Sequence, residues 1–366
     1  MPTDRPTLAP PNLSPCSGAE RFMRFHREIP PRADFDYQVL VGPHQVSGAA
    51  LNDIRGFFGL VLNKTMPFGC FRDEEGHIYA PVRALMSPTG TPNPTTFFYQ
   101  STRMDGQNLC MDRPRMAAQA QTALPVQSLE GDACTWRSQT TDAGNPWVVT
   151  ASGEQMSWKE EGLFDIGGRL LGVGMQWYLP GVDWGTFYAS QIYEVAGECL
   201  GHKVKGIISI DQAYLAEGGA IHYQKDLVVN NGMHVIWWNF ATVYKDGGFD
   251  VGSIMVGHKN LGYALLQNEK GEVRTTTKIE GVARHKAGSY FAEDARIVLD
   301  ENEEWEFLPD PKGQMIDFIG GFPVTAQQEG RWRRVGDTRE PSHWFAWGET
   351  DRRNGPMRNV KGSDIK

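Results

Sequence analysis

The sequence predicts an all-β protein made of two antiparallel β-barrels or sandwiches packed together, with few short helices. Short apolar runs recur at a spacing of roughly 8–12 residues, a pattern typical of sandwiches and barrels. The 41 Gly and 22 Pro residues interrupt every sustained helical periodicity. At 366 residues, 40% of them hydrophobic, the chain is long and apolar enough to form two domains with cores.

Fifteen segments have the apolar and β-branched character of strands. Those in the first half are Gly59–Leu62, Ile78–Leu85, Thr96–Gln100, Pro146–Thr150, Arg169–Tyr178, Thr186–Val195 and Lys203–Ile210. Those in the second half are Ala220–Val229, Met233–Tyr244, Gly252–Val256, Tyr263–Gln267, Val273–Ala283, Ala295–Leu299, Met315–Gly320 and Gln328–Arg334. The segment Pro114–Ala123, rich in Ala, Gln and Met, is the one helix that we expect.

Turn residues separate several of these strands. Asn231-Gly232 lies between two apolar runs, and both residues tolerate a positive φ, so a type I′ hairpin is expected there. Glu74-Glu75-Gly76, Lys245-Asp246-Gly247-Gly248 and Asn268-Glu269-Lys270-Gly271 have the composition of three further hairpin loops.

The distribution of strands divides the chain into three parts. Residues 1–20 contain five Pro and no apolar run, which predicts a flexible Pro-rich arm. A boundary within residues 212–220 gives two halves of seven or eight strands each. We therefore expect one β domain over residues 21–215 and a second over residues 216–366.

Charge and motif content exclude several classes of function. A net charge of −8 disfavours nucleic acid and anionic membranes as partners. No signal peptide and no spanning apolar run is visible, which predicts a cytoplasmic protein without membrane insertion. The five Cys form no C-x-x-C pair and the nine His are scattered, so we expect neither a metal nor a redox site. No nucleotide-binding or hydrolase motif is present, and no cofactor is expected.

An aromatic segment from Gln176 to Tyr244 is the richest part of the chain. Within it, the strand Met233–Tyr244 is apolar on both faces, so one face fills a barrel while the other packs against the second barrel or lines a cavity. Asn239 interrupts one of these faces, and a buried amide needs hydrogen-bond partners. Those partners are either backbone groups at a barrel corner or a ligand.

Asp211 is the candidate acid. It follows the apolar residues of the strand Lys203–Ile210, where desolvation raises the pKa of a carboxyl group and makes it a proton donor near neutral pH. Neighbouring rings would stabilise a developing carbocation. The alternative is an ordinary turn residue at a strand end. His222 is likewise either an acid/base group or a histidine of the core.

Several residues of this segment resemble a known family. Trp177-Tyr178, the run Tyr188 to Val195, Gly197, Gly206 and Ile210-Asp211-Gln212-Ala213-Tyr214, followed by Ile236-Trp237-Trp238-Asn239, look like the carotenoid 1,2-hydratase and AttH-like superfamily. The resemblance covers roughly residues 165 to 250. It implies two lipocalin-like barrels with a ligand site between or within them.

The resemblance also implies a chemistry. Members are hydratases, and relatives include cyclases of fungal polyketide pathways. Asp211 would match the Asp of the family's Asp-His-Gln-Trp-Gly motif and Tyr214 its Trp. Gln212, Ala213 and Leu215 replace the His, Gln and Gly, so isomerase, cyclase and dehydratase activities stay open beside hydration.

Two functional hypotheses follow. The first is a lyase or isomerase that uses acid/base chemistry on a hydrophobic terpenoid, polyketide or polycyclic substrate, without metal or cofactor; the second is a non-catalytic carrier of such a molecule. The candidate catalytic residues are Asp211, Tyr214 and His222. The candidate substrate-binding residues are Trp177, Tyr178, Trp184, Tyr193, Trp237, Trp238 and Asn239. The sequence leaves a homodimer open.

Overall fold

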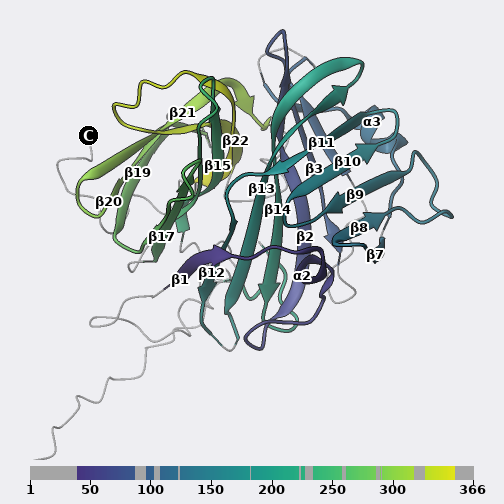
Figure 1. Cartoon of the computed structure of the whole chain (residues 1–366), viewed down its shortest axis with the longest axis horizontal. Helices are drawn as coiled ribbons and strands as arrows, with labels where there is room; N and C mark the ends of the chain where they lie inside the picture. Colours follow the sequence, from purple (N-terminus) through teal and green to yellow (C-terminus); the bar gives the residue numbers. More distant parts are fainter. Residues whose placement is uncertain are drawn as a thin grey trace, which may run out of the picture.

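The computed structural model describes residues 39–86, 96–102, 108–122, 124–181, 183–221, 224–226, 234–257, 261–285, 289, 291–316 and 326–350. These residues form two antiparallel sheets, one a half-barrel and the other a nearly closed barrel, which confirms the predicted all-β fold (Figure 1). We call the first sheet along the chain and its interior the first barrel, and the second sheet and its interior the second barrel. The short helices α2 (Gly48–Asn52) and α3 (Arg113–Ala118) lie beside the first sheet. No helix of the described residues has the length and apolar character needed to cross a membrane.

The first sheet has 14 strands in the described part of the chain. They are β1 (Leu40–His44), β2 (Val61–Asp73), β3 (Ile78–Arg83), β4 (Leu85–Met86), β5 (Thr96–Gln100), β6 (Cys110–Met111), β7 (Val126–Glu130), β8 (Ala133–Arg137), β9 (Trp147–Ala151), β10 (Gln155–Glu160), β11 (Phe164–Leu170), β12 (Gly174–Leu179), β13 (Thr186–Cys199) and β14 (His202–Leu215). The hairpin of β13 and β14 lies at its centre, flanked by β2 on one side and by β11 and β12 on the other.

The second sheet has 9 strands in the described part of the chain. They are β15 (His234–Tyr244), β16 (Phe249–Gly257), β17 (Gly262–Asn268), β18 (Val273–Thr276), β19 (Ile279–His285), β20 (Ala292–Leu299), β21 (Glu303–Gln314), β22 (Ala326–Arg334) and β23 (Pro341–Thr350). β15 pairs with β16 on one side and with β23 on the other.

The strand predictions are right where apolar runs are uninterrupted. Thr96–Gln100 matches β5, and most of the others overlap longer strands. The prediction Arg169–Tyr178 is wrong at its middle, because Gly172 turns the chain at a φ of 67° between β11 and β12. Val273–Ala283 is two strands, β18 and β19.

Two more predicted strands and the end of the predicted helix also differ from the structure. The described residues of Ala220–Val229 form only an isolated bridge between Ala220 and Gln224, and the described residues of Met315–Gly320 lie outside any strand. The helix ends at Ala118, earlier than expected. The strands β1, β6, β7, β8, β10, β21 and β23 were not predicted. Polar or charged residues interrupt most of them, but β23 contains an apolar run at residues 344–347.

Three of the predicted hairpin loops are confirmed. Residues 74–77 join β2 to β3, residues 245–248 join β15 to β16, and residues 269–272 join β17 to β18. Gly76, Gly247 and Gly271 take φ values of 80°, 89° and 74°, which L side chains rarely adopt. The Asn231-Gly232 turn lies outside the described residues.

β15 is buried on both faces, as its sequence predicts. Trp238 and Phe240 fill the second barrel, whereas Ala241 and Val243 pack against the first sheet. Gly348 and Gly252 make room for the inward rings: a Cβ on Gly348 would lie 2.3 Å from the ring of Trp238, and one on Gly252 2.3 Å from that of Phe240. The two sheets therefore share an interface formed by the outer faces of β2, β12, β13 and β14 and of β15, β16, β17 and β23.

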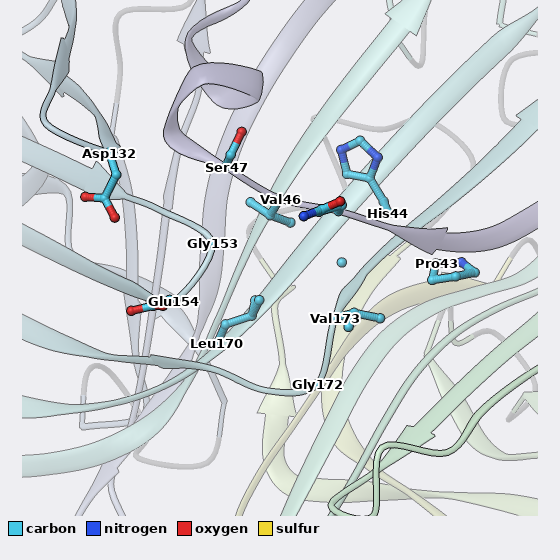
Figure 2. A pocket seen from close by; sticks show the side chains of 12 residues that line it. Pro43, His44, Val46, Ser47, Asp132, Gly153, Glu154, Leu170, Gly172 and Val173 are labelled. Atoms are coloured by element: carbon cyan, nitrogen blue, oxygen red, sulfur yellow. The ribbon is translucent and has the colours of Figure 1, made fainter.

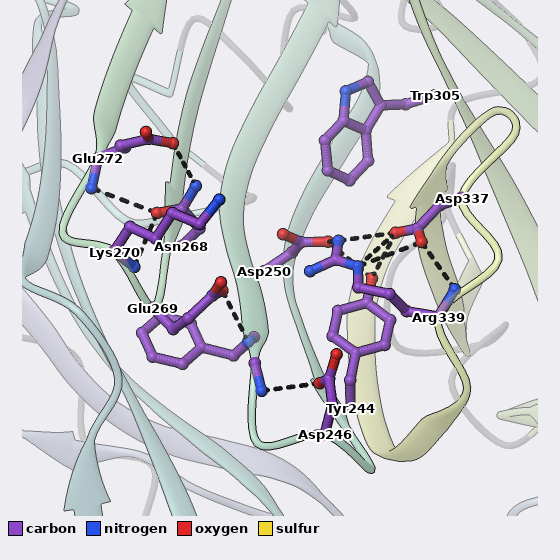
Figure 3. Close-up of polar contacts among 12 residues, drawn as sticks. Tyr244, Asp246, Asp250, Asn268, Glu269, Lys270, Glu272, Trp305, Asp337 and Arg339 are labelled. Atoms are coloured by element: carbon purple, nitrogen blue, oxygen red, sulfur yellow. Dashed lines mark hydrogen bonds and ion pairs between the residues drawn. The ribbon is translucent and has the colours of Figure 1, made fainter.

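A charged network fixes one end of the second sheet (Figure 3). The hydroxyl of Tyr244 donates to Asp250 over 2.6 Å, and the guanidinium of Arg339 bonds Asp337 and lies 3.8 Å over the ring of Tyr244. Burial raises the pKa of Asp250, although the hydrogen bond from Tyr244 and the charge of Arg339 oppose this shift. The network ties the β15–β16 hairpin to the segment before β23.

Candidate functional site

Asp211 lies in the centre of the first sheet, on the face that meets the second sheet. Its side chain is 0% exposed. Its pairing partners are Met66 on β2 and Ser190 on β13, and Ser190 in turn lies opposite Met175 on β12. The register therefore sets one carboxyl group in a row of apolar and hydroxyl side chains.

Three side chains hold the Asp211 carboxyl group by hydrogen bonds. The hydroxyl of Tyr188 donates to Oδ2 over 2.8 Å, and the hydroxyl of Ser209 donates to Oδ1 over 2.6 Å. The amide of Asn239, from β15 of the second sheet, lies 3.2 and 3.1 Å from the two oxygens. The site is thus assembled from both sheets.

Burial controls the protonation of Asp211. Desolvation raises its pKa from 3.8 to about 7, although the hydrogen bonds from Ser209, Tyr188 and Asn239 favour the carboxylate. Near neutral pH the group therefore holds a proton in a large fraction of the molecules. A carboxyl group in this state can donate a proton and receive one back.

The structure shows which groups bond the buried amide of Asn239. Its amide nitrogen bonds Asp211 and, over 2.9 Å, the hydroxyl of Ser190, so its partners are side chains of the first sheet. Its Oδ1 atom is buried and has no partner among the described residues. A buried acceptor of this kind is satisfied by water or by a ligand group that donates.

Four aromatic rings stand beside Asp211. Trp177 stacks on Tyr188 with centroids 5.5 Å apart, Trp237 meets the edge of Tyr188 at 5.8 Å, and Tyr263 lies 5.6 Å from Trp177. The indole Nε1 of Trp177 is buried without a partner among the described residues. The rings form an apolar, electron-rich surrounding for the acid.

The margin of this cluster is accessible to solvent. Lys64, Met66, Trp184 and Trp237 are only partly buried, although all but Trp184 lie on sheet faces that pack together. Lys64 is opposite Ala213, which is opposite Tyr188, so it shares one row with the rings. Burial lowers the pKa of Lys64.

The structure brings together some of the predicted site residues and separates others. Asp211, Trp177, Trp237 and Asn239 lie at one place, with Trp184 packed at its edge. His222 lies outside the described residues.

The remaining predicted residues lie elsewhere. Tyr193 points into the first barrel and donates to the carbonyl of Ser152 over 2.7 Å. Trp238 points into the second barrel and donates to the carbonyl of Ala346 over 3.0 Å. Tyr214 and Tyr178 pack with Phe187 on the opposite face of the first sheet from Asp211.

Sequence reasoning did not assign a role at Asp211 to Tyr188, Ser190 or Ser209. The position of Ser209 beside Asp211 could have been predicted, since residues two apart on a strand share a face. Tyr188 and Ser190 depend on the register of β13 against β14, which their own sequence does not determine.

A second buried acid lies on the same interface. Glu329 on β22 is 0% exposed, and burial raises its pKa to about 7. It accepts from the thiol of Cys70 over 3.2 Å, and Arg72 beside it bonds Asp310. No group of three or more His, Cys, Asp or Glu side chains in the described part of the chain could hold a metal ion.

A pocket at the edge of the first sheet has a volume of about 680 Å³ (Figure 2). Pro43, His44, Val46, Leu170 and Val173 are among its lining residues. It lies where the chain leaves β1 and passes from β11 to β12, away from Asp211.

Comparison with known proteins finds similarity in structure but not in sequence. No protein-family model matches the chain, and no curated protein matches its sequence. The chain is similar to an AttH protein from Nitrosomonas europaea, at 15% identity over 79% of this chain and 92% of that one, with a TM-score of 0.44. It is also similar to CghA, at 10% identity over 81% and 89% of the two chains, with a TM-score of 0.40.

Kievitone hydratase from Nectria haematococca is a third similar structure, at 10% identity over 85% of this chain and 97% of that one, with a TM-score of 0.37. An AttH protein and a hydratase, the kinds of protein that the sequence resemblance named, are thus among the solved structures similar to this chain.

Proposed function

We propose that the protein is a lyase or isomerase that protonates a hydrophobic substrate with Asp211. The observation that carries this proposal is the buried Asp211 carboxyl group with a pKa of about 7, beside the rings of Trp177 and Tyr188. An acid that is half protonated near neutral pH is suited to general acid catalysis.

The proposed reaction begins with proton transfer from Asp211 to a C=C bond or to the oxygen of a C–O bond. Protonation of a C=C bond leaves positive charge on the adjacent carbon, and protonation of a C–O oxygen does so once that bond breaks and water or an alcohol leaves. The faces of Trp177, Tyr188 and Trp237 stabilise this cation. The cation then adds water, loses a neighbouring proton, or is attacked by another double bond of the substrate. In each case the Asp211 carboxylate takes back the proton that the resulting cation loses. Hydration, dehydration, isomerisation and cyclisation are therefore alternative outcomes of one acid step.

Two neighbours set the geometry of this acid. Tyr188 and Asn239 donate to the carboxylate form and thereby hold it in place after its proton has left. The unpartnered Oδ1 of Asn239 and Nε1 of Trp177 offer one acceptor and one donor to a substrate. We assign no role in this step to Tyr214, because it lies on the other face of the sheet.

The surroundings favour an apolar substrate. Aromatic rings and the side chains of Met66, Met175 and Met255 border the carboxyl group, and apolar surface of this kind binds apolar molecules. Terpenoid, polyketide and polycyclic molecules have the required combination of double bonds, hydroxyl groups and apolar surface.

The replacement Asp211→Asn tests the proposal. The amide has nearly the same shape but no acidic proton, so product formation from a panel of such substrates should fall at least 100-fold while binding changes little. Glu329→Gln is the matched control: it removes a buried acid of similar pKa from the same interface, and turnover should stay as in the unchanged protein.

The same experiment decides between enzyme and carrier. A carrier would bind the panel without converting any member, before and after the substitution. Unchanged turnover in the Asp211→Asn protein would contradict the role of this acid. Mass spectrometry of molecules that co-purify with the protein supplies the first members of the panel.

A further inference from the structure

The opposite face of the same central strands carries a layer of uncharged polar side chains. We call Gln176, Gln191 and Gln212 the glutamine layer. Gln176 lies opposite Ala189, Ala189 opposite Gln212, and Gln212 opposite Thr65, while Gln191 lies two residues along β13 from Ala189 on the same face. The glutamine layer thus crosses the inside of the first sheet from β12 to β2.

The glutamine layer separates two hydrophobic clusters. On one side, Tyr193 and Ile210 belong to the main core of the first barrel. On the other, Phe187, Ala189 and Tyr214 form a cluster closed by the ring of Phe57, 5.1 Å from that of Tyr214. A polar layer between two apolar ones is costly in a barrel interior unless something bonds to it.

Gln191 has no such partner within the described protein. It is 0% exposed, and neither its Nε2 nor its Oε1 forms a hydrogen bond. The Nε2 of Gln212, a residue that is 2% exposed, is unpartnered as well. These two Nε2 donors and one Oε1 acceptor therefore lack partners inside the barrel. A molecule that both accepts and donates hydrogen bonds would satisfy them.

The chemistry of the layer is that of a neutral ligand. Carboxamides carry no charge, and the imidazole of His44 bonds Gln176 over 3.1 Å. Burial lowers the pKa of His44, so its ring is neutral. A hydroxyl or carbonyl group suits these partners, whereas an ionised group would lose its hydration without gaining a counter-charge.

The pocket of Figure 2 adjoins this layer at His44. Its volume of about 680 Å³ is within the range of small-molecule sites. His44 lines it and bonds Gln176, and Gly174, opposite His44, lines it as well. Val46, Leu170 and Val173 supply apolar wall, and Asp132 and Glu154 lie at the same pocket, where they disfavour an anion.

We propose that the first barrel holds a second binding site, separate from Asp211, for a neutral molecule with an apolar body and a hydroxyl or carbonyl end. The apolar body lies in the pocket beside Val46 and Leu170. The polar end reaches the amides of Gln191 and Gln212.

Three fluorescent probes that share one apolar body test the charge preference. Pyrenebutanol, pyrenebutyrate and pyrenebutylamine differ only in a neutral, an anionic or a cationic end. In fluorescence titrations of the full chain, pyrenebutanol should bind at least tenfold more tightly than either charged probe. Equal binding of the three, or no binding of pyrenebutanol, would overturn the proposal; the second result would mean that the layer holds water alone.

Substitutions test the contact itself. Gln191→Leu and Gln212→Leu should each weaken pyrenebutanol about tenfold, the loss of one hydrogen bond in a buried site. Asp211→Asn should leave this binding unchanged, which separates the second site from the proposed reaction. Unaltered affinity in both glutamine variants would overturn the assignment.

A matched control distinguishes a loss of binding from a loss of stability. Gln328 is 2% exposed, but both ends of its amide bond the main chain of Ala292. Gln328→Leu should lower the melting temperature and leave pyrenebutanol affinity unchanged. Gln191→Leu should not lower the melting temperature, because Gln191 gives up no hydrogen bond within the protein.

Discussion

The side-chain amide of Asn239, on the first strand of the second sheet, donates to both carboxylate oxygens of Asp211, on the last strand of the first sheet. This contact crosses the interface between the sheets at a place where neither residue is exposed. It makes the protonation of Asp211 depend on how the two sheets are packed.

Removing this contact should shift the titration of Asp211. In Asn239→Leu the carboxylate loses its amide donor, so its pKa should rise above about 7 by about one unit. Carbon NMR of the aspartate carboxyl groups measures this value, with Asp211→Asn identifying the signal. Ser253→Ala is the control, since the Ser253 hydroxyl bonds Tyr263 and not Asp211; an unshifted titration in Asn239→Leu would contradict the coupling.

The raised pKa of Asp211 should make stability depend on pH. Between 3.8 and about 7 the folded protein keeps a proton that the unfolded chain releases, so the free energy of unfolding falls as pH rises through this range. One pKa unit corresponds to about 1.4 kcal/mol, and the full loss above pH 7 is therefore about 4 kcal/mol.

Asp211→Asn should remove that part of the pH dependence. Denaturant unfolding at pH 5 and pH 8 should show a smaller difference in the variant than in the unchanged protein. Glu329 contributes in the same direction, because its pKa is also raised to about 7, so Asp211→Asn with Glu329→Gln should flatten the profile further. A profile identical to that of the unchanged protein would mean that Asp211 ionises at its ordinary pH.

The first barrel contains an ion pair whose disruption should be costly. Arg83 bonds both oxygens of Glu160 over 2.7 and 2.8 Å, and the two residues are 1% and 0% exposed. Among the described residues, Arg83→Leu leaves the buried carboxylate bonded only by Trp158 and Thr96, and it should destabilise the protein by about 3–5 kcal/mol. Urea denaturation measures this loss, and the double variant with Glu160→Leu should recover much of it.

Gly348 should be intolerant of even one methyl group. A Cβ there would lie 2.1 Å from the carbonyl oxygen of Trp237 and 2.3 Å from the ring of Trp238, so Gly348→Ala should cost about 1–3 kcal/mol by overpacking. Gly42→Ala is the matched control on β1, because nothing lies within 4 Å of its added Cβ. Equal melting temperatures of the two variants would contradict this account of β15.

Much of the fold could be predicted because it depends on local patterns. Apolar runs and turn residues located β5, β13, β14, β15, β16 and β17 within a few residues. β10 was missed because charged and polar residues alternate with its buried ones, so it has no continuous apolar run. β23 was missed although its residues 344–347 form such a run. The break at Gly172 depends on a backbone conformation that composition does not reveal.

The candidate site was predictable only in part. The position of Asp211 after an apolar run, and of Asn239 on an apolar face, were readable because burial follows from strand periodicity. The chain position of Tyr214 groups it with Asp211, yet alternation sets residues three apart on opposite faces. The aromatic content of the segment could not distinguish Trp237, beside Asp211, from Trp238, inside the second barrel.

The sequence alone determined that the central strands are apolar on both faces and that Asp211 and Asn239 lie among these apolar residues, because side-chain alternation is a local property. Only the tertiary structure decided that Asn239 bonds Asp211 and that the Gln191 amide has no hydrogen-bond partner among the described residues, since these contacts depend on register and on sheet packing. Register is fixed by the sum of many distant contacts, which no short segment encodes.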